Sequence, residues 1–160
     1  MLRKSLLLTI MLSLFWVTLS TTCFAEKRAT REECIARVEQ AAKLIGQVGA
    51  EAAFKKIMDP AGPFIWKDAH VFCIDTKTAI LLAHSVTDYV GSAMRFYTDA
   101  EGGTPYSDIL DLVSTGRSQG WLTYISDRMG RTERRLKHMH YRKVADKDIV
   151  ICAGYYPETI

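Results

Sequence analysis

The stretch HVFCIDTKTAILLAHS, residues 70–85, decides the fold because two short apolar runs, HVFCID and AILLAHS, flank the polar triplet TKT. Such runs on either side of a short polar connection indicate a β-hairpin. Side chains alternate across a strand, so His70 and Phe72 share one face of the first run and Val71 and Cys73 share the other. The polar and aromatic face suits a binding site, and the Val/Cys face suits packing against a helix.

Helical patterns precede the hairpin, and a helix and more strands follow it. Segment 31–48 begins with the capping box TREE and repeats apolar residues at helical spacing, while 50–58 predicts a second, shorter helix. After an irregular polar stretch, 86–104, the segment 105–116 opens with proline and predicts a third helix. Three further strands are predicted: GWLTYIS (120–126), RRLKHMHYRKV (134–144) and DIVICAGYY (148–156). This order predicts an α+β fold with an antiparallel sheet.

Residues 1–25 have the three parts of a secretory signal peptide. Arg3 and Lys4 precede an apolar run of 14 residues, and small residues then lead to Ala25. The run is shorter than the ~20 residues that a membrane-spanning helix needs. We therefore expect cleavage after Ala25 and a single periplasmic domain over residues 26–160, with an uncleaved anchor as the alternative.

The charge balance excludes one class of partner. Without Arg3 and Lys4 the chain has 19 basic and 18 acidic residues, a net charge of +1. Nucleic-acid-binding domains carry a large basic excess, so we expect no nucleic-acid partner.

The cysteine count leaves two alternatives open. Cys34, Cys73 and Cys152 lie beyond the predicted cleavage site, so at most one internal disulfide can form in the oxidising periplasm. Either Cys73 bridges Cys152, or all three are buried free thiols that pack as small hydrophobic residues.

Four segments, taken in order, show a resemblance to a known family: LIGQVGAEAAFKKIMDPAGPFI, HVFCIDTKTAILLAHSVTDYVG, GGTPYSDIL…GRSQGWLTY and YRKVADKDIVICAGYY. Their order and spacing resemble the single Cache domains of bacterial extracytoplasmic sensors, from about Ala42 to Tyr156. The resemblance implies a long N-terminal helix packed on a five-stranded antiparallel PAS-like sheet. It also implies a small-ligand pocket between the sheet and the segment that joins the second and third strands.

The resemblance also implies a function. Members of this class bind small carboxylates and related metabolites and generally have no catalytic activity. No P-loop or nucleophile-elbow motif occurs in the sequence, so we expect neither an enzyme nor a cofactor. Sensors of this class usually continue into a transmembrane helix, whereas this sequence ends four residues after Tyr156. We therefore expect a free-standing periplasmic unit that signals through a membrane sensor kinase or chemoreceptor, and a homodimer through the N-terminal helix.

The predicted ligand contacts come from three of the strands and comprise His70, Phe72, Trp121, Lys137, His138 and Tyr141. An ammonium at the base of an aromatic-walled pocket would neutralise a carboxylate and form charge-assisted hydrogen bonds with it. Trp121 is the predicted pocket wall, and Tyr124 would lie on the opposite face of the same strand. His84 is a weaker candidate, with a structural hydrogen bond to the turn as its alternative.

The fourth strand departs from the family pattern by one residue. Members commonly have a lysine three residues before a tyrosine, but here Lys137 lies four residues before Tyr141 and His138 takes the usual place. A shift of one residue moves a side chain to the other face of the sheet. Sequence alone leaves open whether Lys137 or His138 faces the pocket.

Two other hypotheses remain. In the first, an accessory protein without its own ligand docks on a sensor kinase or chemoreceptor through the basic strand end at Arg134 and Arg135. In the second, a small metal-dependent enzyme uses the four histidines, because His138 and His140 share a strand face. A zinc site needs three or four ligands, so His70 and His84 would have to converge on that pair. We expect no metal.

Overall fold

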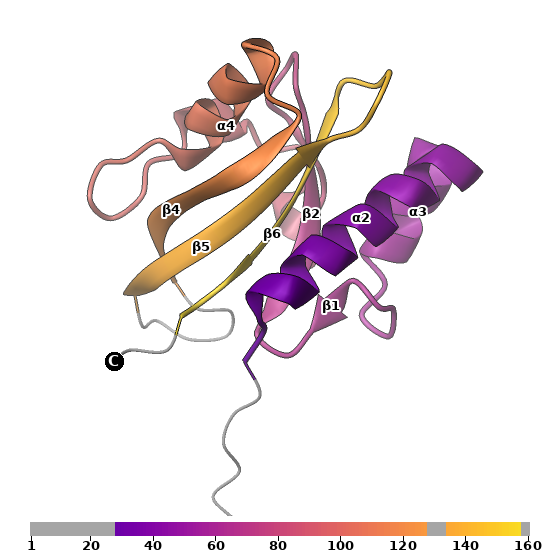
Figure 1. The fold of residues 1–160 in the computed structure, drawn as a ribbon, viewed down its shortest axis with the longest axis horizontal. Coiled ribbons are helices and arrows are strands. Elements are labelled where there is room, and N and C mark those ends of the chain that lie inside the picture. The colour runs from indigo at the N-terminus through magenta and orange to yellow at the C-terminus, as the bar shows by residue number, and fades with distance from the viewer. Residues whose placement is uncertain (1–27, 128–133, 158–160) are drawn as a thin grey trace, which may run out of the picture.

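The computed structural model describes residues 28–127 and 134–157. The helices α2 (Arg31–Val48) and α3 (Ala50–Ile57) lie side by side on one face of a sheet, and α4 (Pro105–Ser114) lies on the other face (Figure 1). The predicted signal peptide lies outside the described residues.

The sheet is antiparallel throughout and confirms the predicted α+β class. Its order is β1-β2-β6-β5-β4, and β3 also pairs with β2. The five predicted strands are present. A sixth strand of two residues, IW, precedes the hairpin; it was not predicted because two residues are too few to show a period in the sequence. The strands are β1 (Ile65–Trp66), β2 (Ala69–Asp75), β3 (Leu81–Ala83), β4 (Gln119–Asp127), β5 (Arg134–Lys143) and β6 (Ile149–Tyr155).

Local chemistry explains where the helices begin and end. The Thr30 hydroxyl accepts the Glu33 amide hydrogen at 3.2 Å, and the Glu33 carboxylate accepts the Thr30 amide hydrogen at 2.9 Å. This is the predicted capping box. Gly49 ends α2 with a φ of 80°, a left-handed conformation that costs glycine little. The polar stretch between β3 and α4 contains two 3-10 helices, η1 (Thr87–Tyr89) and η2 (Met94–Phe96).

Each face of the sheet has its own buried core. The core on the α2 and α3 side includes Cys34, Val38, Ala41, Ile45, Ile57, Val71, Cys73 and Ile151. The core on the α4 side includes Phe72, Ile74, Ile109, Leu110, Tyr124, Met139, Tyr141 and Cys152.

The two cores decide the disulfide question. Cys73 belongs to the α2 side and Cys152 to the α4 side, so their side chains point away from each other across the sheet. A Cys73–Cys152 bridge is therefore wrong, because the two Cβ vectors diverge. Cys34, Cys73 and Cys152 are buried free thiols, which was the other alternative.

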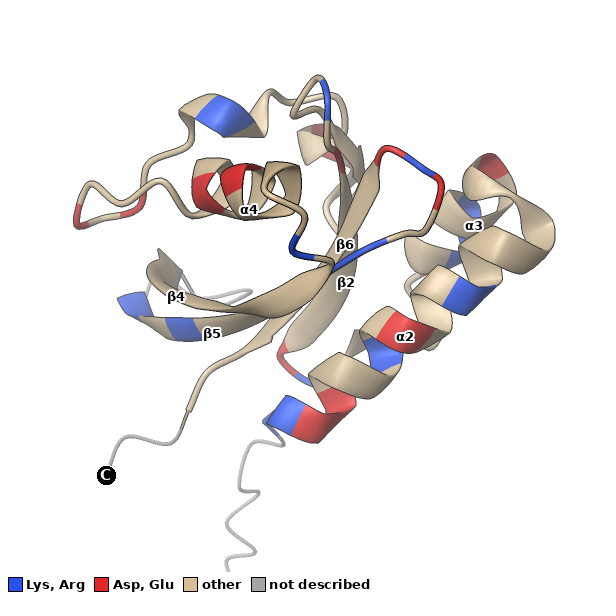
Figure 2. Ribbon diagram, turned by 45° about the horizontal axis from the view of Figure 1, so that its top comes forward, with Lys and Arg blue, Asp and Glu red and all other residues tan. Residues whose placement is uncertain are grey.

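The ionic side chains lie mainly on the helices, in the loops and at the strand ends. Figure 2 shows charged residues along α2 and α3, while β2 and β6 are largely uncharged. Within residues 28–127 and 134–157, no helix is long enough and apolar enough to cross a membrane.

Packing of α2 on the sheet generates the first prediction. Ile45 is fully buried in the core between α2 and the sheet. We expect Ile45→Ala to lower the free energy of unfolding by about 3 kcal/mol, since it removes buried apolar contacts and leaves a cavity. Urea denaturation measures this. Gln47→Ala, at an exposed position of the same helix, should change the value by no more than about 0.5 kcal/mol. Equal effects of the two substitutions would contradict the packing described here.

Candidate functional site

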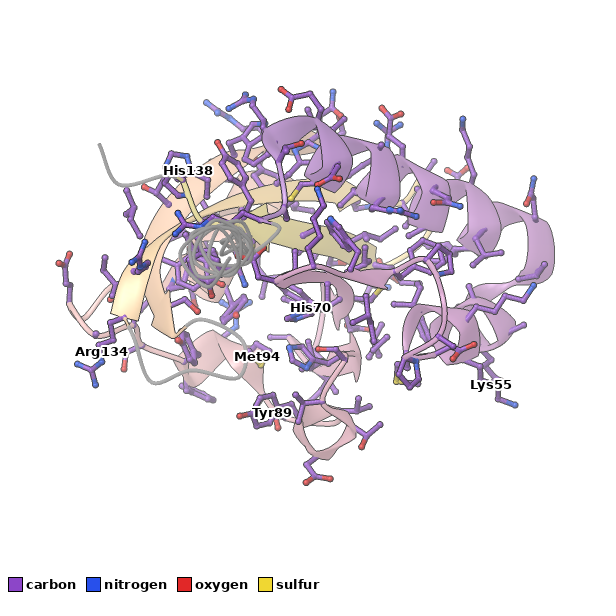
Figure 3. All side chains as sticks on the ribbon, turned by 90° about the horizontal axis from the view of Figure 1, so that it is seen from below. Lys55, His70, Tyr89, Met94, Arg134 and His138 are labelled. Carbon is purple, nitrogen blue, oxygen red and sulfur yellow. The ribbon has the colours of Figure 1, made fainter. Side chains whose placement is uncertain are left out.

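The register of β5 determines which side chains face α4. Lys137 pairs opposite Tyr124 of β4, and His138 pairs opposite Tyr155 of β6, with no bulge in either ladder. Lys137 is only 7% exposed and lies on the α4 side with Met139. His138 points to the α2 side, as Figure 3 shows. Lys137, and not His138, therefore lies on the same face of the sheet as His70 and Phe72 of β2.

The Lys137 side chain is buried with its charged group beside an aromatic ring. Its Nζ atom lies 5.3 Å from the centroid of the Tyr156 ring, a cation–π distance. A Cβ atom on Gly154 of β6 would lie 2.8 Å from the Lys137 Cε atom and 2.9 Å from the His138 backbone oxygen, so glycine leaves room for the Lys137 side chain in its present position. Burial lowers the pKa of Lys137 to about 8, and the nearby Asp68 carboxylate opposes that shift only partly.

No carboxylate forms an ion pair with Lys137 among the residues that the structure describes. The ion pairs there include those of Lys67 with Glu33, Lys77 with Asp148, Arg95 with Asp111, and Arg142 with Glu39. A buried ammonium without a paired anion is costly, because the charge has lost much of its hydration.

A histidine pair lies near Lys137. The Nε2 atoms of His70 and His84 are 2.9 Å apart, and the Nδ1 atom of His84 accepts the backbone amide hydrogen of Val86 at 2.9 Å. An acceptor at His84 Nδ1 places the proton of the neutral ring on Nε2, from which it is donated to His70 Nε2. The proton of His70 therefore lies on Nδ1.

The Nδ1 atom of His70 is the unsatisfied end of this chain. It is buried and has no hydrogen-bond partner among residues 28–127 and 134–157. A buried donor without a partner costs about 1–3 kcal/mol. His70 itself is 8% exposed, so its N–H group has little access to water.

Both histidines are neutral at physiological pH. Burial, reinforced by the positive charge of Lys137, holds the pKa of His70 well below its usual value. Burial also lowers the pKa of His84 to about 4, against the opposing hydrogen bond from Val86. The Lys137 side chain reaches β6 beside this pair: its Cε atom would lie 2.8 Å from a Cβ atom on Gly154, which follows Ala153, and Ala153 pairs with Val71 next to His70.

Aromatic rings form a connected series of contacts beside these polar groups. Phe72 lies 5.8 Å from His70 and 5.9 Å from Tyr106, and Tyr106 lies 6.0 Å from Tyr124, between ring centroids. We call the assembled set the Lys137 cluster, which consists of His70, Phe72, His84, Tyr106, Tyr124, Lys137 and Tyr156.

The segment between β3 and α4 contacts the cluster from outside the sheet. The ring of Tyr89 in η1 lies 5.3 Å from His84, and Tyr97 lies 5.0 Å from Tyr106. Figure 3 shows His70 on the side of the sheet where Tyr89 and Met94 lie. The cluster is thus placed between the sheet and the segment joining β3 to α4.

Three solved structures are similar to this chain at low sequence identity. A Cache chemosensory domain, described with the structural basis of its carboxylic acid recognition, has a TM-score of 0.68 at 14% identity, over 79% of this chain and 92% of that chain. A methyl-accepting chemotaxis protein from Vibrio parahaemolyticus RIMD 2210633 has a TM-score of 0.64 at 16% identity, over 78% and 86%. The periplasmic sensor domain of a chemotaxis protein has a TM-score of 0.59 at 15% identity, over 79% and 90%.

The chain has the Cache fold. The resemblance seen in the sequence is confirmed at the level of architecture, including the long helix on an antiparallel PAS-like sheet. No protein-family model matches the chain, and no curated protein matches it closely.

The Cache sheet separates the six predicted contacts. His70, Phe72 and Lys137 lie together in the cluster. Trp121 faces α2 instead, where the Arg31 guanidinium lies 4.3 Å from its ring centroid and His140 lies 4.9 Å from it.

His138 and Tyr141 also lie outside the cluster. The His138 ring lies 5.4 Å from Tyr155, on the α2 side of the sheet. Tyr141 shares the face of Lys137 but is four residues further along β5, about 13 Å at the spacing of a strand. Its ring packs against Gly120, where an added Cβ atom would lie 2.7 Å from the Tyr141 hydroxyl.

The histidines do not converge on one metal site. His70 and His84 form a pair on the α4 side, whereas His138 and His140 lie on the α2 side. Within the described part of the chain, no group of three or more His, Cys, Asp or Glu side chains could hold a metal ion. The hypothesis of a four-histidine enzyme is therefore wrong in its geometry.

Sequence reasoning missed three members of the cluster, Tyr106, Tyr124 and Tyr156. Tyr106 lies in the first turn of α4, and Tyr156 follows β6, so neither belongs to a strand whose alternation reveals its face. Tyr124 does lie on a strand, and its pairing with Lys137 places Tyr124, and not Trp121, on the face of the Lys137 cluster. That pairing depends on a register which sequence did not fix.

The neutral histidine pair generates a prediction about pH. Because the folded-state pKa of His84 lies near 4 and the unfolded-state value near 6.5, the unfolded chain binds more protons between these values. Stability is thus full above pH 6.5 and is lost as the pH falls toward 4. We expect His84→Gln to reduce that loss by about 1.2 kcal/mol between pH 6 and 5.

Urea denaturation at a series of pH values, for the native chain and the variant, measures the difference. The acid-sensitive groups that do not contact His84 are common to both proteins and cancel. Parallel curves would contradict a neutral, buried His84.

Proposed function

We propose that this chain is a periplasmic Cache-type sensory protein that binds a short-chain carboxylate at the Lys137 cluster. The observation that carries the proposal is the buried ammonium of Lys137, which lies among aromatic rings and has no ion-paired carboxylate among the described residues. A carboxylate bound there would supply the missing counter-charge, in a setting where charge-assisted hydrogen bonds are strong.

The similar structures support the same ligand class. One of them is a Cache domain that recognises carboxylic acids, and the others belong to chemotaxis proteins. These similarities support the fold directly and the ligand only by analogy. The independent support from this chain is the chemistry of Lys137 and His70, which both present N–H donors.

The chemistry of the cysteines and histidines favours binding over catalysis. Burial raises the pKa of Cys34 to about 12 and raises the pKa values of Cys73 and Cys152 further still. The thiols therefore stay protonated at neutral pH and are poor nucleophiles. His70 hydrogen-bonds to another histidine and not to a serine or cysteine nucleophile.

Location and partner belong to the same proposal. The predicted signal peptide at residues 1–25 would deliver the domain to the periplasm. The similar chemotaxis domains support a membrane chemoreceptor or sensor kinase as the signalling partner. Homodimerisation through α2 is a further part of the proposal.

The first test removes the ammonium. We expect the native chain to bind at least one of acetate, propionate, L-lactate and pyruvate saturably in isothermal titration calorimetry. Lys137→Met should weaken that binding at least tenfold, because a hydrogen bond to a charged group contributes about 1.5–3 kcal/mol. The variant should unfold with a free energy no lower than that of the native chain, since a buried charge has been replaced by an apolar side chain of similar length.

Lys55→Met is the matched control, because Lys55 is exposed on α3, far from His70 (Figure 3). Its carboxylate affinity should equal that of the native chain. A folded native chain that binds none of the four carboxylates would contradict the proposal and favour the accessory, ligand-free alternative.

The second test uses the pKa of Lys137. A carboxylate binds the charged ammonium, which has a pKa of about 8 and is therefore nearly complete at pH 7, half present near pH 8 and lost above it. We expect the dissociation constant to be nearly constant from pH 6.5 to 7.5 and to rise toward tenfold per unit above pH 8. Calorimetric titrations from pH 6.5 to 9.5 give this profile. A constant affinity up to pH 9.5 would mean that Lys137 is not the anion-binding group.

A further inference from the structure

We propose that His70 is a second ligand-binding residue, which donates its Nδ1–H group to an oxygen of the bound carboxylate, and that His84 positions it by fixing its tautomer. This inference rests on the proposed function. It adds the residue that complements Lys137 and the rule by which the site discriminates between ligands.

The direction of donation begins at the backbone. The amide nitrogen of Val86 can only donate, so the His84 Nδ1 atom 2.9 Å away must accept. His84 then has one remaining proton position, Nε2, and donates to the His70 Nε2 atom at 2.9 Å. Only Nδ1 of His70 is left to carry a proton.

The Nδ1–H group of His70 has no hydrogen-bond partner within the described ranges, although the His70 ring contacts other rings. His70 is 8% exposed, and its ring contacts those of Phe72 and His84 at centroid distances of 5.8 and 4.4 Å. A buried, oriented N–H group close to a buried ammonium is the arrangement that an anion-binding site requires. The two groups together offer donors only.

A donor-only pair sets a simple selection rule. An oxygen of a carboxylate can accept from both Lys137 and His70. An ammonium group placed there would meet a like charge and an N–H donor with no acceptor. We therefore expect the native chain to bind L-lactate at least tenfold more tightly than L-alanine, which differs from it in carrying an ammonium group in place of the hydroxyl.

Two substitutions of His70 separate its two nitrogen atoms. The amide of glutamine reaches the position of Nε2, so His70→Gln retains the contact with His84 and removes the donor at Nδ1. The amide of asparagine reaches the position of Nδ1, so His70→Asn retains that donor. We expect His70→Gln to weaken binding of the carboxylates that bind the native chain at least tenfold, and His70→Asn to restore most of the affinity.

Nitrogen-15 NMR of the histidine rings tests the tautomers without relying on a His70 variant. We expect His70 in the unliganded native chain to carry its proton on Nδ1 and His84 on Nε2, and the His70 Nδ1–H resonance to shift on addition of L-lactate or pyruvate. His84→Ala should release His70 into a mixture of tautomers, while His84→Gln, whose amide can donate to His70 Nε2, should preserve the native form.

The possible results are distinguishable. A native chain that binds no carboxylate overturns the proposed function. Binding that depends on Lys137 but is unchanged in His70→Gln overturns the role of His70 and leaves the proposed function intact. A proton on Nε2 of His70, or equal affinities for L-lactate and L-alanine, overturns the donor-only rule even if His70→Gln fails to fold.

Discussion

The unbroken antiparallel pairing of β5 with β4 and β6 is the constraint on which the rest of the structure depends. Because helices cover both faces of the sheet, the buried residues of β5 point toward one side or the other in alternation. The pairing of Lys137 with Tyr124 places the ammonium among the aromatic rings under α4, and the next residue, His138, falls under α2. A shift of one residue would exchange these two side chains and place a histidine where the charge now lies.

Burying this lysine costs its ammonium much of its hydration, and contacts within the fold compensate for only part of that loss. The Tyr156 ring offers a cation–π contact, and Gly154 leaves space for the side chain, but neither neutralises the charge. The orphaned N–H group of His70 nearby adds a second unsatisfied donor. In the proposed function these two donors would be pre-organised for a small anion, whose binding energy would offset the cost. In that proposal the fold arranges the aromatic rings, and Lys137 and His70 provide the donors.

The sequence predicted the elements well because their determinants are local. The capping box at Thr30, the helical stripe that follows it and the alternation in residues 70–75 each act within a few residues. The face that carries the Lys137 cluster was harder to predict, because it depends on which strand residues lie opposite each other. Trp121 was placed on the wrong side for this reason, since α2 packs over it and the Arg31 guanidinium covers its ring. Tyr106 was missed because the contact that brings it to Phe72 joins segments far apart in sequence. The disulfide prediction failed for a similar reason. Whether two cysteines can pair depends on which face of the sheet each side chain occupies, and the spacing of the cysteines in the sequence does not reveal this.

The most direct measurement follows the protonation of Lys137 itself. The side chains can be labelled with carbon-13, and the Cε resonance of Lys137 followed by NMR from pH 6 to 11, with and without pyruvate. We expect a pKa near 8 in the unliganded chain, well below the 10.4 of an ordinary lysine, and a clear rise when the carboxylate is bound. A Lys137 that titrates near 10.4 in both conditions would contradict a buried ammonium that awaits an anionic ligand.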